Sequence, residues 1–295
     1  MKAMEGGPPK EPSAASKRIV GAVVRGFFLR GRRGGPWPVP DHLSAERVTL
    51  TGNSGARIAA LHVRHDAPRG IVVLAHPDRR YGKHWFLREG WVDWLLSNGL
   101  EAVLFDFAAY GESSGGSTYF HDDVAAACEY AHEARPDLPL HLVGLSLGAF
   151  ACINASPRLP PIDGLVLESP YPTFASWYAE ARGQRALGVL NSAFGAVART
   201  TYRRIDAGAN AAAVRAQRIL VVASADDAVT PIGLSESVAA GLPAERTRVM
   251  RLRGEHLGLF RDATYRLAIL ETLAPTPPTA GQRLYPRLAE GALTR

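Results

Sequence analysis

Short apolar runs, each long enough for one buried strand, alternate with segments of helical periodicity along most of this 295-residue chain. The runs at 71–75, 102–105, 140–143, 164–167 and 219–223 have the mostly apolar character of strands buried on both faces, and a further strand is expected at 248–252. Helical patterns separate them, at 84–97, 121–134, 146–154, from 233 and at 265–273. This alternation predicts an α/β fold, with a mostly parallel twisted sheet and helices on both of its faces.

Two further strands are expected before this alternation begins. Residues 46–51 and 57–64 are rich in β-formers and flank the turn-rich stretch TGNSG, which predicts an antiparallel hairpin. We expect one domain over residues 42–274, with a helical insertion at about 170–212. Residues 1–41 are predicted to be a basic, partly disordered arm, and residues 275–295 a loosely ordered tail.

The positive charge of the chain is concentrated in the arm. The formal net charge is +6, and residues 1–40 contain eight basic and two acidic residues, so the rest of the chain is balanced. We therefore expect no nucleic-acid partner for the domain. Apolar residues at near-helical spacing among the arginines suggest peripheral membrane contact through the arm. The alternative is an extension that packs loosely on the domain.

A cytoplasmic location is expected, peripheral to the membrane if the arm binds there. The apolar run at 19–29 is interrupted by Gly21 and Arg25 and is shorter than the roughly 20 residues that span a bilayer. No small-residue cleavage site follows it, so a signal peptide is not expected. Cys128 and Cys152 fall in predicted helices and are expected to be buried free thiols. Patterns for phosphate loops, dinucleotide sites and metal sites are missing, so no cofactor and no metal are expected.

A serine between two glycines marks the junction of one predicted strand and the helix that follows it. The stretch GLSLG places Gly144, Ser146 and Gly148 at this junction. Glycines on either side allow a sharp turn that exposes the serine hydroxyl. The unpaired N–H groups at the start of the helix favour negative charge nearby. We interpret Ser146 as a nucleophile; the alternative is a turn in which the glycines serve only the backbone.

A serine hydroxyl needs a base, and a histidine base needs a carboxylate that fixes its tautomer. His256 follows the last predicted strand and is expected at the same carboxyl edge of the sheet as Ser146. Asp226 and Asp227 follow the preceding strand, and Glu168 ends an earlier one at the same edge. The sequence therefore predicts His256 as the base and offers three candidate acids.

The stretches AHPD, FDFAAYGESSGG, GLSLG, ILVVASADDAVTP and GEH, in this order, resemble the α/β-hydrolase superfamily. They are similar in particular to its serine esterases and lipases and to the BEM46-like hydrolases. The resemblance covers about residues 46–273. It implies the α/β-hydrolase fold and a catalytic triad of Ser146, Asp227 and His256 in that chain order.

The resemblance also bears on the choice of acid. In this family the strand before the acid ends in His-Gly, and the acid follows after two more residues. An ungapped match puts Ala223 and Ser224 on His-Gly and Asp227 on the acid. Asp227 is therefore preferred, with Asp226 and Glu168 as the alternatives.

Two backbone N–H groups are implied for an oxyanion hole, those of Leu147 and Asp78. The chain departs from the family in the second loop, HPDRR, where a proline without an N–H follows the histidine. A carboxylate beside an oxyanion would oppose it. We expect the Asp78 side chain to turn away and pair with Arg79, Arg80 or Lys83; the alternative is a degenerate hole.

The helical insertion carries an apolar stripe that includes Phe174, Trp177 and Tyr178. In this fold, an insertion at this place roofs the active site, where it excludes water and accepts an apolar group. These three residues are predicted to line the substrate pocket. The alternative is that the stripe only packs on the sheet.

The predicted activity is that of a serine hydrolase, which cleaves small-molecule carboxylic esters or thioesters through an acyl-enzyme intermediate. The same residues would serve a peptidase or an acyltransferase, because they determine acyl transfer but neither the leaving group nor the acceptor. An alternative of another class is a catalytically silent relative that binds a ligand or a membrane.

Overall fold

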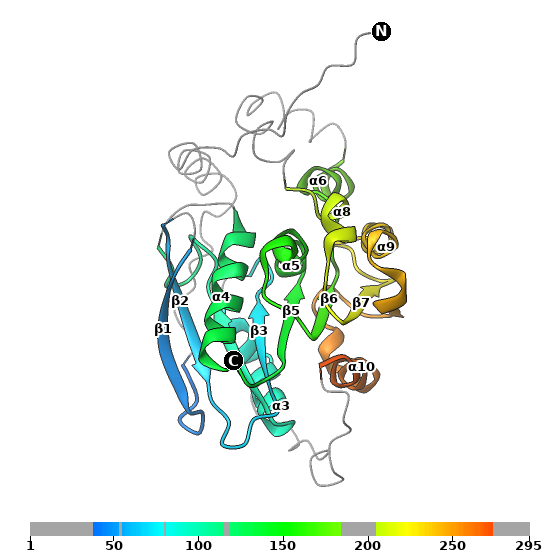
Figure 1. The fold of residues 1–295 in the computed structure, drawn as a ribbon. Coiled ribbons are helices and arrows are strands. Elements are labelled where there is room, and N and C mark those ends of the chain that lie inside the picture. The colour runs from blue at the N-terminus through cyan, green and yellow to red at the C-terminus, as the bar shows by residue number, and fades with distance from the viewer. Residues whose placement is uncertain (1–37, 53–54, 80, 115–118, 184–204, 274–295) are drawn as a thin grey trace, which may run out of the picture.

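The structure, a computed structural model, describes residues 38–52, 55–79, 81–114, 119–183 and 205–273. Within these ranges eight strands form one sheet in the order β1-β2-β4-β3-β5-β6-β7-β8 (Figure 1). β2 runs antiparallel to β1 and β4, and the other neighbours are parallel. The strands are β1 (Ala45–Thr51), β2 (Arg57–Val63), β3 (Gly70–Ala75), β4 (Leu100–Phe105), β5 (Leu140–Leu145), β6 (Gly164–Glu168), β7 (Arg218–Ser224) and β8 (Thr247–Leu252).

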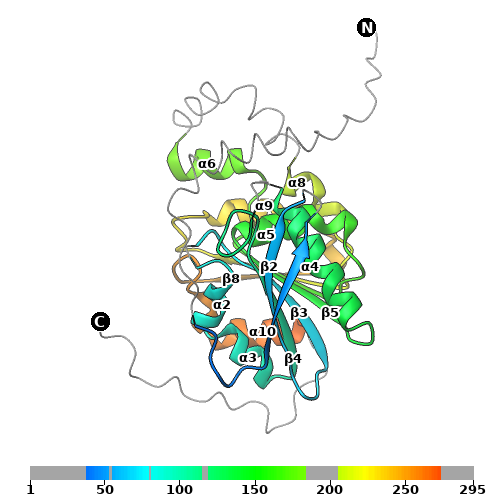
Figure 2. The same cartoon turned by 90° about the vertical axis from the view of Figure 1, so that its left-hand side faces the viewer.

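Helices cover both faces of the sheet (Figures 1 and 2). The described α-helices are α2 (His84–Arg88), α3 (Trp91–Ser97), α4 (Phe120–Ala134), α5 (Leu147–Ala155), α6 (Phe174–Arg182), α8 (Ala207–Asn210), α9 (Ile232–Gly241) and α10 (Ala263–Leu273). Short 3₁₀ segments occupy Ser156–Arg158, Ala211–Ala213, Ala244–Arg246 and Leu259–Arg261. None of the helices in the described ranges is long and apolar enough to cross a membrane.

The core has two layers, one on each face of the sheet. In β3, Ile71 and Val73 join the layer that contains α4, α5, α8 and α9, whereas Val72 and Leu74 join the layer of α2, α3 and α10. Successive side chains of a strand point to opposite faces, so a strand covered on both sides is apolar throughout. All six residues of β3 are buried, which explains its continuous apolar run.

The expected hairpin is present, with Val48 paired to Ala60 in an antiparallel register. The prediction of one helix over 84–97 is wrong, because Gly90 adopts a left-handed φ of 77° and separates α2 from α3. This turn lets both short helices bury aromatic residues, and the Trp91 ring stacks on Phe260 at 4.0 Å. The two cysteines are free and buried, as predicted.

Parts of the predicted organisation lie outside the described residues. These are nearly all of the basic arm, most of the helical insertion after α6, and the tail. The described part of the insertion is helical where it was expected to be, in α6. The expected boundaries at residues 41 and 274 stay predictions.

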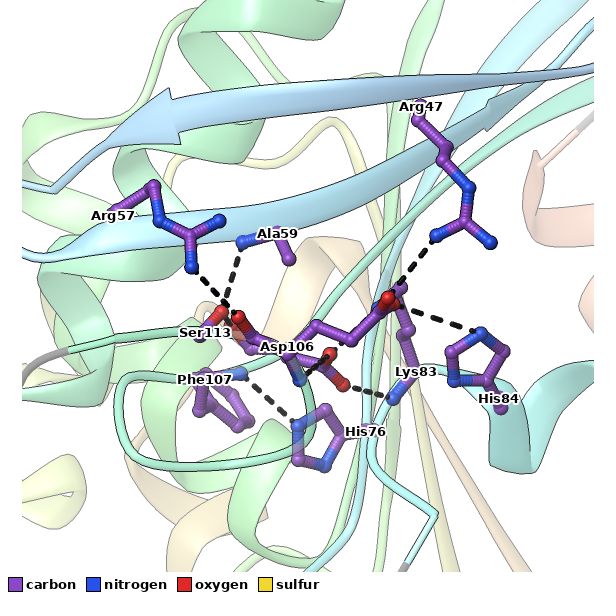
Figure 3. A network of polar contacts seen from close by, with 10 residues as sticks. Arg47, Arg57, Ala59, His76, Lys83, His84, Asp106, Phe107 and Ser113 are labelled. Carbon is purple, nitrogen blue, oxygen red and sulfur yellow. Dashed lines mark hydrogen bonds and ion pairs between the residues drawn. The ribbon is translucent and has the colours of Figure 1, made fainter. Parts of the chain in front are cut away.

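A buried ion cluster joins the loops that follow β3 and β4 (Figure 3). Lys83 Nζ lies 2.6 Å from Asp106 Oδ2 and 2.6 Å from Glu112 Oε2. The backbone N–H of Lys83 donates to Asp106 Oδ1 at 2.8 Å, and that of Glu112 donates to Oδ2 at 2.9 Å. Burial alone would raise the pKa of Asp106, but the charge and the hydrogen bonds of Lys83, together with the other groups around the carboxylate, outweigh burial and hold that pKa below its usual value. The cluster therefore fixes the loop that contains Asp78.

We expect Lys83→Met to destabilise the fold strongly, because it leaves the Asp106 carboxylate buried without its counter-charge. The side chains of Lys83 and Asp106 are 1% and 0% exposed. Breaking a buried pair in this way lowers the free energy of unfolding by about 3–5 kcal/mol, which urea denaturation would measure. The control is Arg47→Met, which removes a 67% exposed partner of Glu112 and should cost less than about 1 kcal/mol. Equal stability of the two variants would contradict the prediction.

Candidate active site

Ser146 lies on a strained turn between β5 and α5. Its φ of 53° and ψ of −110° are unusual for a residue with a side chain. The turn needs a glycine at 148, because a Cβ there would collide with the Ala75 carbonyl oxygen at the end of β3. A Cβ on Gly144 would lie 2.7 Å from the Cys152 sulfur and from the Gly148 carbonyl oxygen. The predicted pattern of small residues around the serine therefore has a packing cause.

His256 bridges Ser146 and Asp227, although 110 residues separate it from the serine. Its Nε2 lies 3.1 Å from Ser146 Oγ, and its Nδ1 lies 2.7 Å from Asp227 Oδ2. An ionised carboxylate only accepts hydrogen bonds, so Nδ1 donates and Nε2 is left to accept the serine proton. The side chains of His256 and Asp227 are 8% and 0% exposed, so the pair is shielded from water.

Four donors surround the Asp227 carboxylate. Oδ2 accepts from His256 and from Ser169 Oγ at 2.9 Å, while Oδ1 accepts from the N–H groups of Val229 and Thr230 at 2.8 and 2.7 Å. Burial alone would raise the pKa of Asp227. The hydrogen bond and charge of His256, with the other donors, outweigh burial and keep that pKa below its usual value. Asp227 is thus held as an ionised and oriented acceptor.

The structure separates Asp227 from the two alternative acids. Asp226 is 47% exposed, and its Oδ2 accepts a hydrogen bond from the Gly254 N–H at 3.2 Å. Glu168 is buried at the end of β6 near Tyr265 and Asp227. Burial and, to a smaller extent, the neighbouring Asp227 charge raise the pKa of Glu168 to about 7, although a hydrogen bond with Tyr265 acts to lower it. Of the three candidates, Asp227 is the carboxylate that contacts His256.

Ser169 was not predicted as a site residue, although its position in the sequence could have indicated it. It comes directly after Glu168 at the carboxyl edge of the sheet, where Ser146, Asp227 and His256 also lie. Its φ of 50° marks a second sharp turn beside the site. A serine in this place carries a hydroxyl that donates to the carboxylate without adding charge.

His76 fixes the start of the loop that contains Asp78. Its Nδ1 lies 2.7 Å from the Pro77 carbonyl oxygen, and its Nε2 accepts from the Phe107 N–H at 3.1 Å. Burial lowers the pKa of His76 to about 4, so the ring stays neutral and keeps this tautomer at neutral pH. The close approach of Gly148 to Ala75 and His76 brings the start of this loop against the first turn of α5. Leu147 and Asp78, whose amides were predicted to bind an oxyanion, thus belong to two adjoining segments.

The Asp78 side chain has a partner outside its own loop. Its Oδ1 accepts a hydrogen bond of 2.5 Å from the Tyr110 hydroxyl. The expected pairing with Lys83 is wrong, because Asp106 and Glu112 draw that ammonium group into the buried cluster. Arg80, another expected partner, lies outside the described residues.

The aromatic residues predicted for the lid lie on α6, which Figure 1 shows beyond the carboxyl ends of the strands. Phe174, Trp177 and Tyr178 are half-buried and contact one another, with the Phe174 centroid 5.4 Å from Trp177 and 5.9 Å from Tyr178. Trp177 Nε1 donates to the Val229 carbonyl at 2.9 Å, which ties α6 to the loop after Asp227. Within the described ranges no cluster of three His, Cys, Asp or Glu residues is placed to hold a metal ion.

We expect Glu168→Gln to flatten the dependence of stability on pH. The carboxyl of Glu168 ionises near pH 7 in the folded chain and at about 4.3 in an unfolded one. Between these values the folded state holds a proton that the unfolded state has lost, so stability falls as pH rises. The variant should gain on the order of 1–3 kcal/mol relative to the wild type between pH 5 and pH 8.

Urea denaturation at the two pH values measures this gain. The control is Glu133→Gln, an exposed glutamate of α4, which should follow the wild type. A gain in Glu133→Gln equal to that in Glu168→Gln would contradict the prediction.

Part of the chain matches a known protein family. The family described as "Serine aminopeptidase, S33" matches residues 66–201. This range contains Ser146 and the loop with Asp78, whereas Asp227 and His256 follow it. A comparison with curated protein sequences gave no significant match.

Solved structures share the fold at low sequence identity. An esterase of Pyrococcus furiosus is 15% identical with a TM-score of 0.66, and the alignment covers 82% of this chain and 94% of that one. A hydrolase from Pseudomonas aeruginosa is 21% identical with a TM-score of 0.55, over 80% of this chain and 100% of that one. An acylaminoacyl peptidase of Pyrococcus horikoshii is 12% identical with a TM-score of 0.61, and the alignment covers 80% of this chain and 42% of that one.

These neighbours confirm the predicted α/β-hydrolase fold, with its mostly parallel sheet and antiparallel N-terminal pair. The finer assignment to the BEM46-like branch stays a prediction. The chain thus has the α/β-hydrolase fold, and its residues 66–201 are similar to a family of serine aminopeptidases.

Proposed function

We propose that this chain hydrolyses carboxylic esters or thioesters of small molecules through an acyl-enzyme intermediate. The observation that carries the proposal is the pair of contacts of His256, 3.1 Å to Ser146 Oγ and 2.7 Å to Asp227 Oδ2. A hydrogen-bonded chain of this kind is what a serine needs to act as a nucleophile near neutral pH.

The first half of the reaction forms the acyl-enzyme. His256 Nε2 takes the proton of Ser146 Oγ as that oxygen attacks the carbonyl carbon. The backbone N–H groups of Leu147 and Asp78 stabilise the oxyanion of the tetrahedral intermediate. When the intermediate collapses, the bond to the leaving alcohol or thiol breaks, and His256 gives its proton to that group.

The second half releases the acid. A water molecule loses a proton to His256 and attacks the acyl carbon, and the bond to Ser146 Oγ breaks as the proton returns to the serine. Asp227 stabilises the imidazolium in both halves and stays ionised. Its hydrogen bonds from Ser169, Val229 and Thr230 support this role, because they favour the charged carboxylate.

The hydrogen bond from Tyr110 to Asp78 supports a working oxyanion hole. It directs the carboxylate to a donor and offsets part of its charge. We infer that the acyl group lies against the aromatic residues of α6, Phe174, Trp177 and Tyr178. Support comes from Trp177, which contacts the Asp227 loop, and from the Phe150 ring, which stacks on Tyr171 at 4.8 Å beneath the helix.

A peptidase on the same triad is the second candidate, because the matching family is described as a serine aminopeptidase. Amide and ester substrates with the same acyl group would separate the two. A cytoplasmic location and membrane contact through the basic arm stay proposals, since the arm lies outside the described residues.

We expect a fluorophosphonate probe to label the wild-type protein and not Ser146→Ala. The probe reports an activated serine, and loss of the nucleophile should lower ester turnover by about 10⁴-fold or more. Mass spectrometry of the labelled protein and turnover of p-nitrophenyl esters are the measurements. Ser237→Ala, on the surface of α9, is the matched control and should keep both activities. A wild-type protein without labelling and without turnover would favour the catalytically silent alternative.

We expect Asp227→Asn to lower kcat by about 10³–10⁴-fold, because an amide no longer fixes the donor tautomer of His256. Asp226→Asn is the matched comparison, one residue away, and should stay within about tenfold of the wild type, since its exposed side chain does not orient the base. Steady-state kinetics on one ester measures both. A larger loss in Asp226→Asn would assign the acid to that residue.

A further inference from the structure

A cleft of about 280 Å³ opens beside His256. Arg79, Tyr81 and Trp85 line it from the loop after β3 and the start of α2, and His256 lines it from the loop after β8. The cleft therefore contacts the proposed base and the residue next to Asp78. Of the residues that line it, His256 is the one that belongs to the proposed triad.

The cleft and the aromatic residues of α6 lie over opposite faces of the sheet. Phe150, Tyr171 and Trp177 pack with the layer of α4 and α5, whereas Trp85 packs with the layer of α2, α3 and α10. Ser146 directly follows β5, which lies between the two layers. A substrate bound at Ser146 could thus extend its acyl group over the layer of α4 and α5 and its leaving group over the layer of α2, α3 and α10.

Proton transfer decides which half of the substrate enters the cleft. His256 must protonate the leaving group as the tetrahedral intermediate collapses, so the leaving group has to lie on the side of the base. The acyl group is proposed to lie against α6. The cleft beside His256 offers space for the leaving alcohol or thiol on that side.

The charge of the cleft is positive. Arg88 lies 3.7 Å from Glu89, and its guanidinium sits 5.3 Å from the centre of the Tyr81 ring, so its charge is offset within the cleft. Among the described residues, Arg79 makes no ion pair, and its side chain is exposed. Its backbone N–H donates to the Pro77 carbonyl at 2.7 Å. A guanidinium in this position suits carboxylate and phosphate groups, to which it can donate two parallel hydrogen bonds.

We propose that the natural substrate is an acyl ester or thioester whose leaving group carries a carboxylate or phosphate, and that Arg79 binds this anion. The proposal rests on the proposed function, because it assigns the leaving-group side of the same site. Tyr81 and Trp85 provide apolar walls for the part of the leaving group between the reacting oxygen or sulfur and the anion.

The test compares matched esters whose leaving phenols differ in charge. The pair is 4-acetoxybenzoate, which is anionic, and its methyl ester, which is neutral; 4-acetoxyphenyl phosphate distinguishes phosphate from carboxylate. The measured quantity is the ratio of kcat/KM for the anionic ester to that for the neutral one. Comparing this ratio between variants cancels the intrinsic reactivity of the esters.

We expect Arg79→Glu to lower this ratio by about tenfold, since it replaces an attraction by a repulsion at a partly exposed site. Added salt should reduce the difference. Arg215→Glu is the matched control, an exposed arginine before β7 at the opposite edge of the sheet, and should leave the ratio unchanged. The larger decrease, for phosphate or for carboxylate, identifies the preferred anion. The proposal would be overturned if the wild type and Arg79→Glu gave the same ratio. It would also be overturned if Arg215→Glu lowered the ratio as much as Arg79→Glu does.

A binding experiment separates failure of this proposal from failure of the proposed function. Calorimetry measures the affinity of 4-hydroxybenzoate, the anionic product, for Ser146→Ala and for Ser146→Ala with Arg79→Glu. Weaker binding in the double variant supports the anion site even if no ester is hydrolysed. Equal binding in the two variants overturns the anion site even if ester hydrolysis depends on Ser146.

Discussion

The contact between the first turn of α5 and the end of β3 is the constraint on which the rest of the site depends. Gly148 allows the helix to approach the Ala75 carbonyl so closely that any side chain would collide with it. This approach holds Ser146 in its strained conformation and places Leu147 beside the loop that begins at His76. Ser146 and the two proposed oxyanion donors are therefore positioned by one backbone contact, and the layers of the core maintain it from both sides of the sheet.

The fold was predictable because its signals are local. A strand covered on both faces must be apolar throughout, so each of the central strands is visible as a short run in the sequence. The order of residues along the chain also located Ser146, Asp227 and His256 at one edge, since the carboxyl ends of parallel strands meet there. The break between α2 and α3 was missed because a glycine in a helical pattern is ambiguous, and the packing of Trp91 on Phe260 depends on residues far apart in the chain.

Side-chain partners far apart in the chain were not predictable in the same way. Nothing in HPDRR indicates that Asp78 pairs with Tyr110, which is 32 residues away, or that Lys83 turns inward to Asp106, 23 residues away. Ser169 and Asp227 are 58 residues apart. Each of these contacts depends on how neighbouring loops fold at the sheet edge, and a nearby residue of opposite charge is a poor guide when a buried carboxylate competes for it.

Two buried carboxyl groups at this edge show how environment assigns different roles to similar residues. Asp227 and Glu168 lie close together, yet the first has its pKa lowered and the second has its pKa raised to about 7. Burial acts on both in the same direction, so the difference comes from the donors that face Asp227, above all His256. Two adjacent negative charges would repel each other in a site shielded from water. Glu168 avoids this repulsion whenever it is protonated, and Asp227, whose pKa is lowered, is the carboxylate that contacts His256.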